Sequence, residues 1–119
     1  MAHAVVLVVE DETLLRLNAI QIIKDAGYEV IEAADADAAI AILESRSDIG
    51  IVFTDIQMPG SMDGLKLANA IRGRWPPVRL ILTSGKTVPK PDEFPSDGRF
   101  IGKPYTSAQL LSVVGELAA

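Results

Sequence analysis

The sequence predicts an α/β fold in which a doubly wound parallel sheet is covered by helices on both faces. Short apolar runs rich in β-branched residues alternate with segments whose apolar residues recur at helical spacing, which is typical of βαβ units. The apolar runs contain few polar positions, as expected of strands that are buried on both faces. Because crossovers between parallel strands are right-handed, successive units should place helices on the two faces of one sheet.

Residues 4–9 (AVVLVV) form the first predicted strand, since a short run of β-branched apolar residues is typical of a buried strand. A helix is expected over residues 13–26, where apolar residues recur at helical spacing up to Ile23, and Gly27 stands where a helix would end. Residues 28–33 then predict the second strand.

Asp35 or Asp37 is expected to cap an alanine-rich helix that runs to about residue 45. Residues 49–54 (IGIVFT) predict the third strand, because they are almost entirely apolar. A loop should follow, since the stretch MPGSMDG combines a proline with two glycines.

A third helix is expected over residues 65–74, because two prolines follow Trp75 and cannot continue a helix. Residues 78–83 (VRLILT) and 99–102 predict the last two strands. Thr106 and Gln109 have the spacing of a capping box, which predicts that the final helix begins there.

The stretch between these last two strands, residues 85–98 (GKTVPKPDEFPSDG), is not expected to form a regular helix. Each proline in a helix interior costs about 3 kcal/mol. The prolines stand at positions 89, 91 and 95. Val88 and Phe94 are the only large apolar residues of the stretch, so their burial is expected to anchor an otherwise irregular and mobile segment with at most one short helical turn.

Composition limits the classes of function. A chain of 119 residues with 49% hydrophobic residues fits one packed domain, taken here as residues 1–119. A net charge of -5 argues against direct nucleic-acid binding, and the absence of cysteine excludes disulfide, zinc-thiolate and thiol redox chemistry. No apolar run is long enough for a membrane span and no signal peptide is recognisable, so a cytoplasmic location is the expectation.

Charged and hydroxyl side chains stand at the ends of the predicted strands, at the edge where ligands of such sheets collect. These residues are Glu10, Asp11, Asp55, Thr83, Ser84 and Lys103. Carboxylates at close range repel one another by about 1–4 kcal/mol per pair, so a cation should offset them. Lys103 supplies one positive charge, and oxygen ligands that retain water suit Mg²⁺.

The motifs VVLVVEDE, VFTDIQMP, ILTS and GKPY occur in this order and resemble those of the receiver domain of bacterial two-component response regulators. The resemblance covers essentially the whole chain. It implies a flavodoxin-like, five-stranded parallel sheet in the order 2-1-3-4-5 with five helices. The chain departs from the family pattern in two places, since the loop MPGSMDG is one residue longer than usual and the fourth crossover is rich in proline.

The resemblance also implies a metal site and an acceptor. Asp55 would accept a phosphoryl group. Mg²⁺ would be held by Asp11, by Asp55 and by the backbone carbonyl of Gln57, while Glu10 would act mostly through a metal-bound water. The peptide bond between Lys103 and the proline after it is expected to be cis.

Three further residues complete the implied mechanism. Thr83 and Lys103 would each hold an oxygen of the phosphoryl group, and Phe100 would be the switch aromatic. Phosphorylation is expected to draw Thr83 toward the phosphoryl group and to let Phe100 turn inward, which would change the packing of residues 85–98. The alternative is a passive loop that merely replaces a helix.

The implied function is phosphorelay signalling, in which a histidine kinase or histidine phosphotransfer protein is the donor and an unknown downstream protein is the target. The chain would assist only its own phosphorylation and dephosphorylation. His3 is expected to have no role, so the donor histidine belongs to another protein. The main alternative is a receiver-like binding scaffold that is never phosphorylated.

Two other classes fit the residues less well. A phosphatase of the haloacid dehalogenase type needs a second aspartate two residues after the nucleophile, where this chain has Gln57. A flavodoxin needs a phosphate cradle after the first strand, where this chain has the acidic run EDE.

Overall fold

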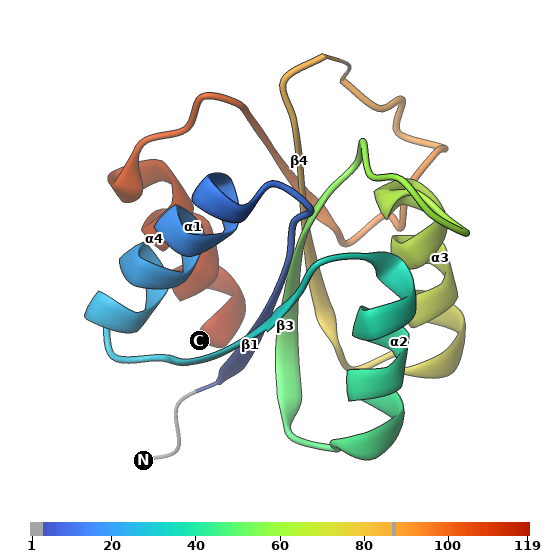
Figure 1. The fold of residues 1–119 in the computed structure, drawn as a ribbon, viewed down its shortest axis with the longest axis horizontal. Helices are drawn as coiled ribbons and strands as arrows, with labels where there is room; N and C mark the ends of the chain where they lie inside the picture. The colour runs from blue at the N-terminus through green and yellow to red at the C-terminus, as the bar shows by residue number, and fades with distance from the viewer. Residues whose placement is uncertain (1–3, 87) are drawn as a thin grey trace.

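The computed structural model describes residues 4–86 and 88–119, and it shows a parallel sheet between two layers of helices (Figure 1). The sheet has five strands in the order β2-β1-β3-β4-β5, which confirms the predicted order. The expectations for His3 lie outside the described residues.

Strands and helices alternate as the sequence pattern predicts. The strands are β1 Val5–Val9, β2 Glu29–Ala33, β3 Ile49–Asp55, β4 Arg79–Ser84 and β5 Arg99–Gly102. The helices are α1 Thr13–Asp25, α2 Ala36–Ser45, α3 Gly64–Arg74 and α4 Ser107–Ala118. Four helices are thus present in the described part of the chain, and the fifth helix implied by the resemblance is replaced by the irregular crossover between β4 and β5.

Helix starts are set by local hydrogen bonds. Asp35, one of the two expected caps, accepts a hydrogen bond from the backbone N–H of Ala38. The predicted capping box of α4 is confirmed, because Thr106 and Gln109 each bond the other's backbone N–H. These contacts satisfy N–H groups that have no partner within the helix.

The apolar side chains form one core on each face of the sheet. On one face, Val6 and Val8 of β1 pack with residues of α1 and α4, among them Ile23. On the other face, Leu7 packs with residues of α2 and α3, among them Leu67. Alternate residues of the buried strand therefore point to opposite helical layers, which are visible on the two sides of the sheet in Figure 1.

The crossover between β4 and β5 is anchored by its prolines. Pro89 and Pro95 are buried, and Phe94 is half-buried against the core on the side of α2 and α3. Val88 is 78% exposed, so the expectation that it would be buried is wrong. Proline suits an irregular buried position because it has no N–H that must find a partner.

Polar contacts also tie the crossover to α3. Asn69 donates from Nδ2 to the carbonyl oxygen of Glu93 at 3.1 Å. Arg72 contacts both carboxylate oxygens of Asp97 at 2.8 Å. The segment is therefore irregular, as predicted, but it is packed and hydrogen-bonded over the same face that a helix would cover.

None of the described helices is long and apolar enough to cross a membrane.

Candidate functional site

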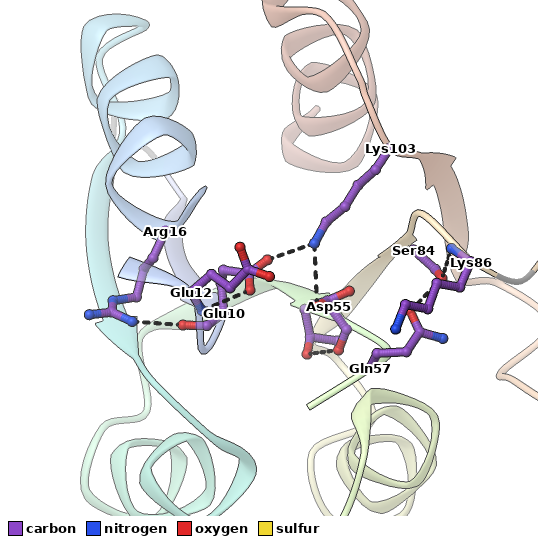
Figure 2. A network of polar contacts seen from close by, with 9 residues as sticks. Glu10, Glu12, Arg16, Asp55, Gln57, Ser84, Lys86 and Lys103 are labelled. Carbon is purple, nitrogen blue, oxygen red and sulfur yellow. Dashed lines mark hydrogen bonds and ion pairs between the residues drawn. The ribbon is translucent and has the colours of Figure 1, made fainter. Parts of the chain in front are cut away.

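The polar residues predicted to cluster do so at the carboxyl end of the sheet. Glu10 and Asp11 follow β1, Asp55 ends β3, and Lys103 follows β5. The parallel register places the Cα of Asp55 opposite that of Thr83 on β4. These positions converge on one edge, where Figure 2 shows Asp55 between Lys103 and the residues after β4.

Three carboxylates lie close together at this edge. Glu10, Asp11 and Asp55 each offer one carboxylate oxygen, and these oxygens lie within 4.8 Å of one another. Asp55 is only 6% exposed, and its Oδ1 has no hydrogen-bond partner among the described residues. Burial raises the pKa of Asp55, and the negative charge of Asp11 raises it further against the opposing effect of Lys103. The site thus favours an additional cation.

Lys103 bridges two of these carboxylates. Its Nζ lies 2.9 Å from Oε1 of Glu10 and 3.3 Å from Oδ2 of Asp55. Burial alone would lower the pKa of Lys103, but the hydrogen bond with Glu10 and the charge of Asp55 outweigh burial and raise it. Burial has the opposite effect on the Glu10 carboxyl and raises its pKa, despite the contact with Lys103. The Lys103–Pro104 peptide bond is cis, as predicted.

Arg16 on α1 fixes the backbone beside Glu10, a role that the sequence analysis did not anticipate. Its Nη1 donates to the carbonyl oxygen of Glu10 at 2.8 Å, and its Nε donates to Glu32 at 2.8 Å. The backbone N–H of Glu12 donates to Glu10 Oε2 at 3.1 Å. Glu10 is therefore held at its backbone and at both carboxylate oxygens, the other oxygen by Lys103.

The loop after Asp55 closes tightly over the backbone of this residue. The N–H of Ile56 donates to the carbonyl oxygen of Thr83, and the N–H of Gly64 donates to the carbonyl oxygen of Ile56, both at 2.9 Å. A Cβ on Gly64 would lie 2.0 Å from the carbonyl oxygen of Asp55. Gly64 is therefore required for this close approach, although the sequence analysis assigned it only to a loop.

Gln57 makes a side-chain contact that the sequence analysis did not predict. Ser84 Oγ donates to Gln57 Oε1 at 2.5 Å, and Ser84 Oγ accepts from the N–H of Lys86 at 3.1 Å. Both bonds are drawn in Figure 2. The residues that follow β3 and β4 are thus joined directly beside Asp55.

The two predicted switch residues lie on neighbouring strands. Thr83 is buried, and its Oγ1 has no hydrogen-bond partner among the described residues. Phe100 is half-buried and packs against the core on the side of α2 and α3, with its Cα paired with that of Leu82. Thr83 therefore has a buried hydroxyl without a hydrogen-bond partner among the described residues. Its Cα pairs with that of Asp55 on β3 and with that of Ile101, the residue after Phe100, on β5.

The family of the chain follows from comparison with known proteins. Residues 6–114 match the family model described as the response regulator receiver domain, so the chain belongs to the response regulator receiver family. This result disfavours the alternatives of a dehalogenase-type phosphatase and a flavodoxin.

Solved structures agree with this assignment. The response regulator receiver protein of Sinorhizobium medicae WSM419 is 30% identical with a TM-score of 0.90, and the match covers 98% of this chain and 94% of that chain. Chemotaxis protein CheY4 of Vibrio cholerae is 28% identical with a TM-score of 0.86, over 98% of this chain and 99% of that chain.

Curated relatives are longer than this chain. Sensor kinase CckA of Brucella abortus is 35% identical over 96% of this chain but only 12% of its own length. Response regulator protein FleR of Pseudomonas aeruginosa is 34% identical over 97% of this chain and 24% of its own length. The chain therefore spans a quarter or less of the length of these two relatives.

Proposed function

We propose that residues 1–119 form a single receiver domain that takes a phosphoryl group on Asp55 and passes the signal to a downstream protein by a change of shape. The observation that carries this proposal is the environment of Asp55. Its carboxylate is buried beside Lys103, and its Oδ1 lacks a partner among the described residues. A structural carboxylate in such a position would be expected to have its oxygens satisfied.

The chemistry requires a nucleophile but no general base. A carboxylate oxygen of Asp55 would form a bond to phosphorus while the bond between phosphorus and the donor atom breaks. The leaving atom, a nitrogen of a phosphohistidine or an oxygen of an acyl phosphate, departs with the electron pair. The work of the site is then to position the reactants and neutralise charge.

The carboxylates fit a hard divalent cation. Glu10, Asp11 and Asp55 bring three oxygens within 4.8 Å, and burial makes the charge of Asp55 costly without a positive neighbour. These residues, with the backbone carbonyl of Gln57, would hold Mg²⁺, and Glu10 would act mostly through a metal-bound water. When bound, Mg²⁺ would neutralise the carboxylates and polarise the phosphoryl oxygens.

Thr83, Lys103 and Phe100 would respond to phosphorylation. The unpartnered hydroxyl of Thr83 would donate to one phosphoryl oxygen, and Lys103 would contact another. A shift of Thr83 would free space for Phe100 to turn inward, beside the crossover that carries Phe94. This response would change the surface that the domain presents to its target.

The phosphodonor protein would dock on α1. Leu14 is 82% exposed and Leu17 is 49% exposed, although large apolar side chains are usually buried. Leu15 lines both the hollow that contains Asp55 and a neighbouring hollow beside Tyr105. An apolar surface next to the proposed acceptor suits a histidine kinase or phosphotransfer protein that must bring its histidine to Asp55. A cytoplasmic location is part of this proposal.

We do not propose that the chain acts on nucleic acid or on membranes, since its net charge is -5. We also propose no other substrate, because the site would modify only the carboxylate of its own Asp55.

The test of the proposed function is incubation of the protein with acetyl phosphate and Mg²⁺. Wild type should gain one phosphoryl group and Asp55→Asn should gain none. Failure of wild type to gain any phosphoryl group would instead favour the second candidate, a binding scaffold that is never phosphorylated.

A further inference from the structure

A second lysine lines the hollow that leads to Asp55. This open hollow has a volume of about 470 Å³. Its charged lining residues are Asp11, Glu12, Asp55, Lys86 and Lys103. Before any cation binds, three carboxylates therefore face two ammonium groups, and a negatively charged ligand that enters meets a repulsive lining.

The backbone of Lys86 is fixed relative to the acceptor. Its N–H donates to Ser84 Oγ at 3.1 Å, and the same Oγ donates to Gln57 Oε1 at 2.5 Å. Ser84 ends β4 and Gln57 follows the acceptor strand β3. Figure 2 shows Lys86 beside these two residues, on a different side of Asp55 from Lys103. Lys86 is exposed, so its ammonium can meet a ligand from solvent.

The two lysines differ in their existing partners. Lys103 lies within 3.3 Å of two carboxylates, so much of its charge is already offset. Lys86 makes no ion pair within 4.0 Å with any carboxylate of residues 4–86 and 88–119. Lys86 is thus the lysine of the hollow whose positive charge is available to an incoming anion.

We propose that Lys86 is a positioning residue that binds dianionic acyl phosphate donors at the mouth of this hollow before transfer to Asp55. The inference rests on the proposed function and adds a determinant of donor preference to it. Attraction between opposite charges at short range raises the local concentration of the anion and is weakened by salt. Lys86 therefore favours a donor with more negative charge and acts on donor binding rather than on the chemical step.

The test compares Lys86→Gln with Lys86→Arg and with Lys90→Gln. Lys90 is an exposed lysine of the same crossover that does not line the hollow, so its replacement removes the same net charge elsewhere. The second-order rate constant of Asp55 phosphorylation is measured with acetyl phosphate, a dianion, and with phosphoramidate, which carries less negative charge. Calorimetry gives the Mg²⁺ affinity of each variant.

The expected loss in Lys86→Gln is about three- to tenfold with acetyl phosphate, smaller with phosphoramidate and smaller again at high salt. Lys86→Arg should recover most of the rate and Lys90→Gln should match wild type. Mg²⁺ affinity should stay equal or rise in Lys86→Gln, because a cation is removed, whereas a damaged site would bind Mg²⁺ more weakly.

Three outcomes would overturn the inference: equal rates for wild type and Lys86→Gln, an equal loss in Lys90→Gln, or a loss that is the same for both donors. Any of these leaves the proposed function intact if wild type is phosphorylated on Asp55. Absence of phosphorylation in wild type would overturn both.

Discussion

Gly64, the first residue of α3, packs directly on the backbone of Asp55, and a Cβ at Gly64 would lie 2.0 Å from the Asp55 carbonyl oxygen. Real Cβ atoms do not approach backbone atoms this closely, so any side chain at Gly64 must move the loop after β3. The position of the Asp55 backbone and the start of α3 are therefore coupled.

Gly64→Ala should lower the free energy of unfolding by about 1–3 kcal/mol, as expected for overpacking at a buried backbone contact. Urea denaturation monitored by circular dichroism measures this change. Gly73→Ala in the same helix is the control, since a Cβ there meets no atom within 4 Å. It should be neutral or stabilising by up to about 1 kcal/mol because alanine favours helix. Equal stability of the two variants would contradict the account.

Asp55→Asn should stabilise the protein in EDTA at neutral pH. Burial raises the pKa of Asp55 above its ordinary value, so the folded state disfavours the ionised carboxylate that the unfolded chain readily forms. The free-energy cost of ionising Asp55 in the folded wild type is absent below the unfolded-state pKa. It grows as pH rises through the raised folded-state pKa. The stability advantage of the variant should therefore be largest at neutral pH and should vanish on acidification toward the ordinary carboxyl pKa.

Asp48→Asn supplies a control of opposite sign. A hydrogen bond from Arg46 lowers the pKa of Asp48, so its ionised form favours the folded state above the unfolded-state pKa and loses that effect as pH falls. The variant should show no stability gain at neutral pH. Thermal melts at several pH values measure both effects, and a destabilised Asp55→Asn at neutral pH in EDTA would refute the prediction.

Arg72→Ala should loosen the crossover between β4 and β5 with little effect on the rest of the fold. The bidentate contact of Arg72 with Asp97 joins α3 to this segment at 2.8 Å. Because the pair is partly exposed, the loss of global stability should not exceed about 1 kcal/mol. Hydrogen exchange over residues 88–98 should accelerate in Arg72→Ala but not in Arg74→Ala, whose ion pair with Glu44 lies elsewhere.

The same measurement tests the switch hypothesis. Wild-type exchange over residues 88–98 should change on phosphorylation if Thr83 and Phe100 alter the packing of the crossover. Either exchange as slow as that of the sheet or the absence of any response to phosphorylation would indicate that the crossover is a passive loop.

Leu14→Asp should slow phosphotransfer from a protein donor but not from acetyl phosphate. A charge in place of an exposed apolar contact residue should reduce the protein-dependent rate by about tenfold or more, the range for the loss of an anchor in an interface. Val88→Asp is the matched control, because Val88 is similarly exposed, at 78%, but lies on the crossover. Equal rates of protein-dependent transfer for Leu14→Asp and wild type would remove α1 as the docking surface.

Local sequence signals predicted the sheet and the residues at its edge. Continuous β-branched runs identify buried strands, and the strand ends follow directly, so the amino-acid pattern alone places Glu10, Asp55 and Lys103 together. The capping box that begins at Thr106 is also a local sequence signal, and it correctly predicted the start of α4. The proline content likewise predicted the irregular crossover, because proline is incompatible with a helix interior.

Contacts between distant segments could not be read from local patterns. Nothing in the sequence near Gly64 indicates that a Cβ there would collide with the Asp55 carbonyl oxygen. The hydrogen bond from Arg16 to the backbone of Glu10 likewise depends on how α1 packs. One of the two expected anchors of the crossover was misassigned for a similar reason, whereas the other, Phe94, does pack against the core. Val88 was expected inside because it is apolar, whereas Pro89 and Pro95 occupy the buried positions.

The most direct test of the central claim is to map the phosphoryl group after brief incubation with acetyl phosphate and Mg²⁺, using mass spectrometry of peptides from wild type, Asp55→Asn and Asp11→Ala. Wild type should carry one phosphoryl group on Asp55, with little label in EDTA or in Asp11→Ala and none in Asp55→Asn. Labelling of Asp55→Asn as readily as wild type, or a wild-type label on another residue, would show that Asp55 is not the acceptor.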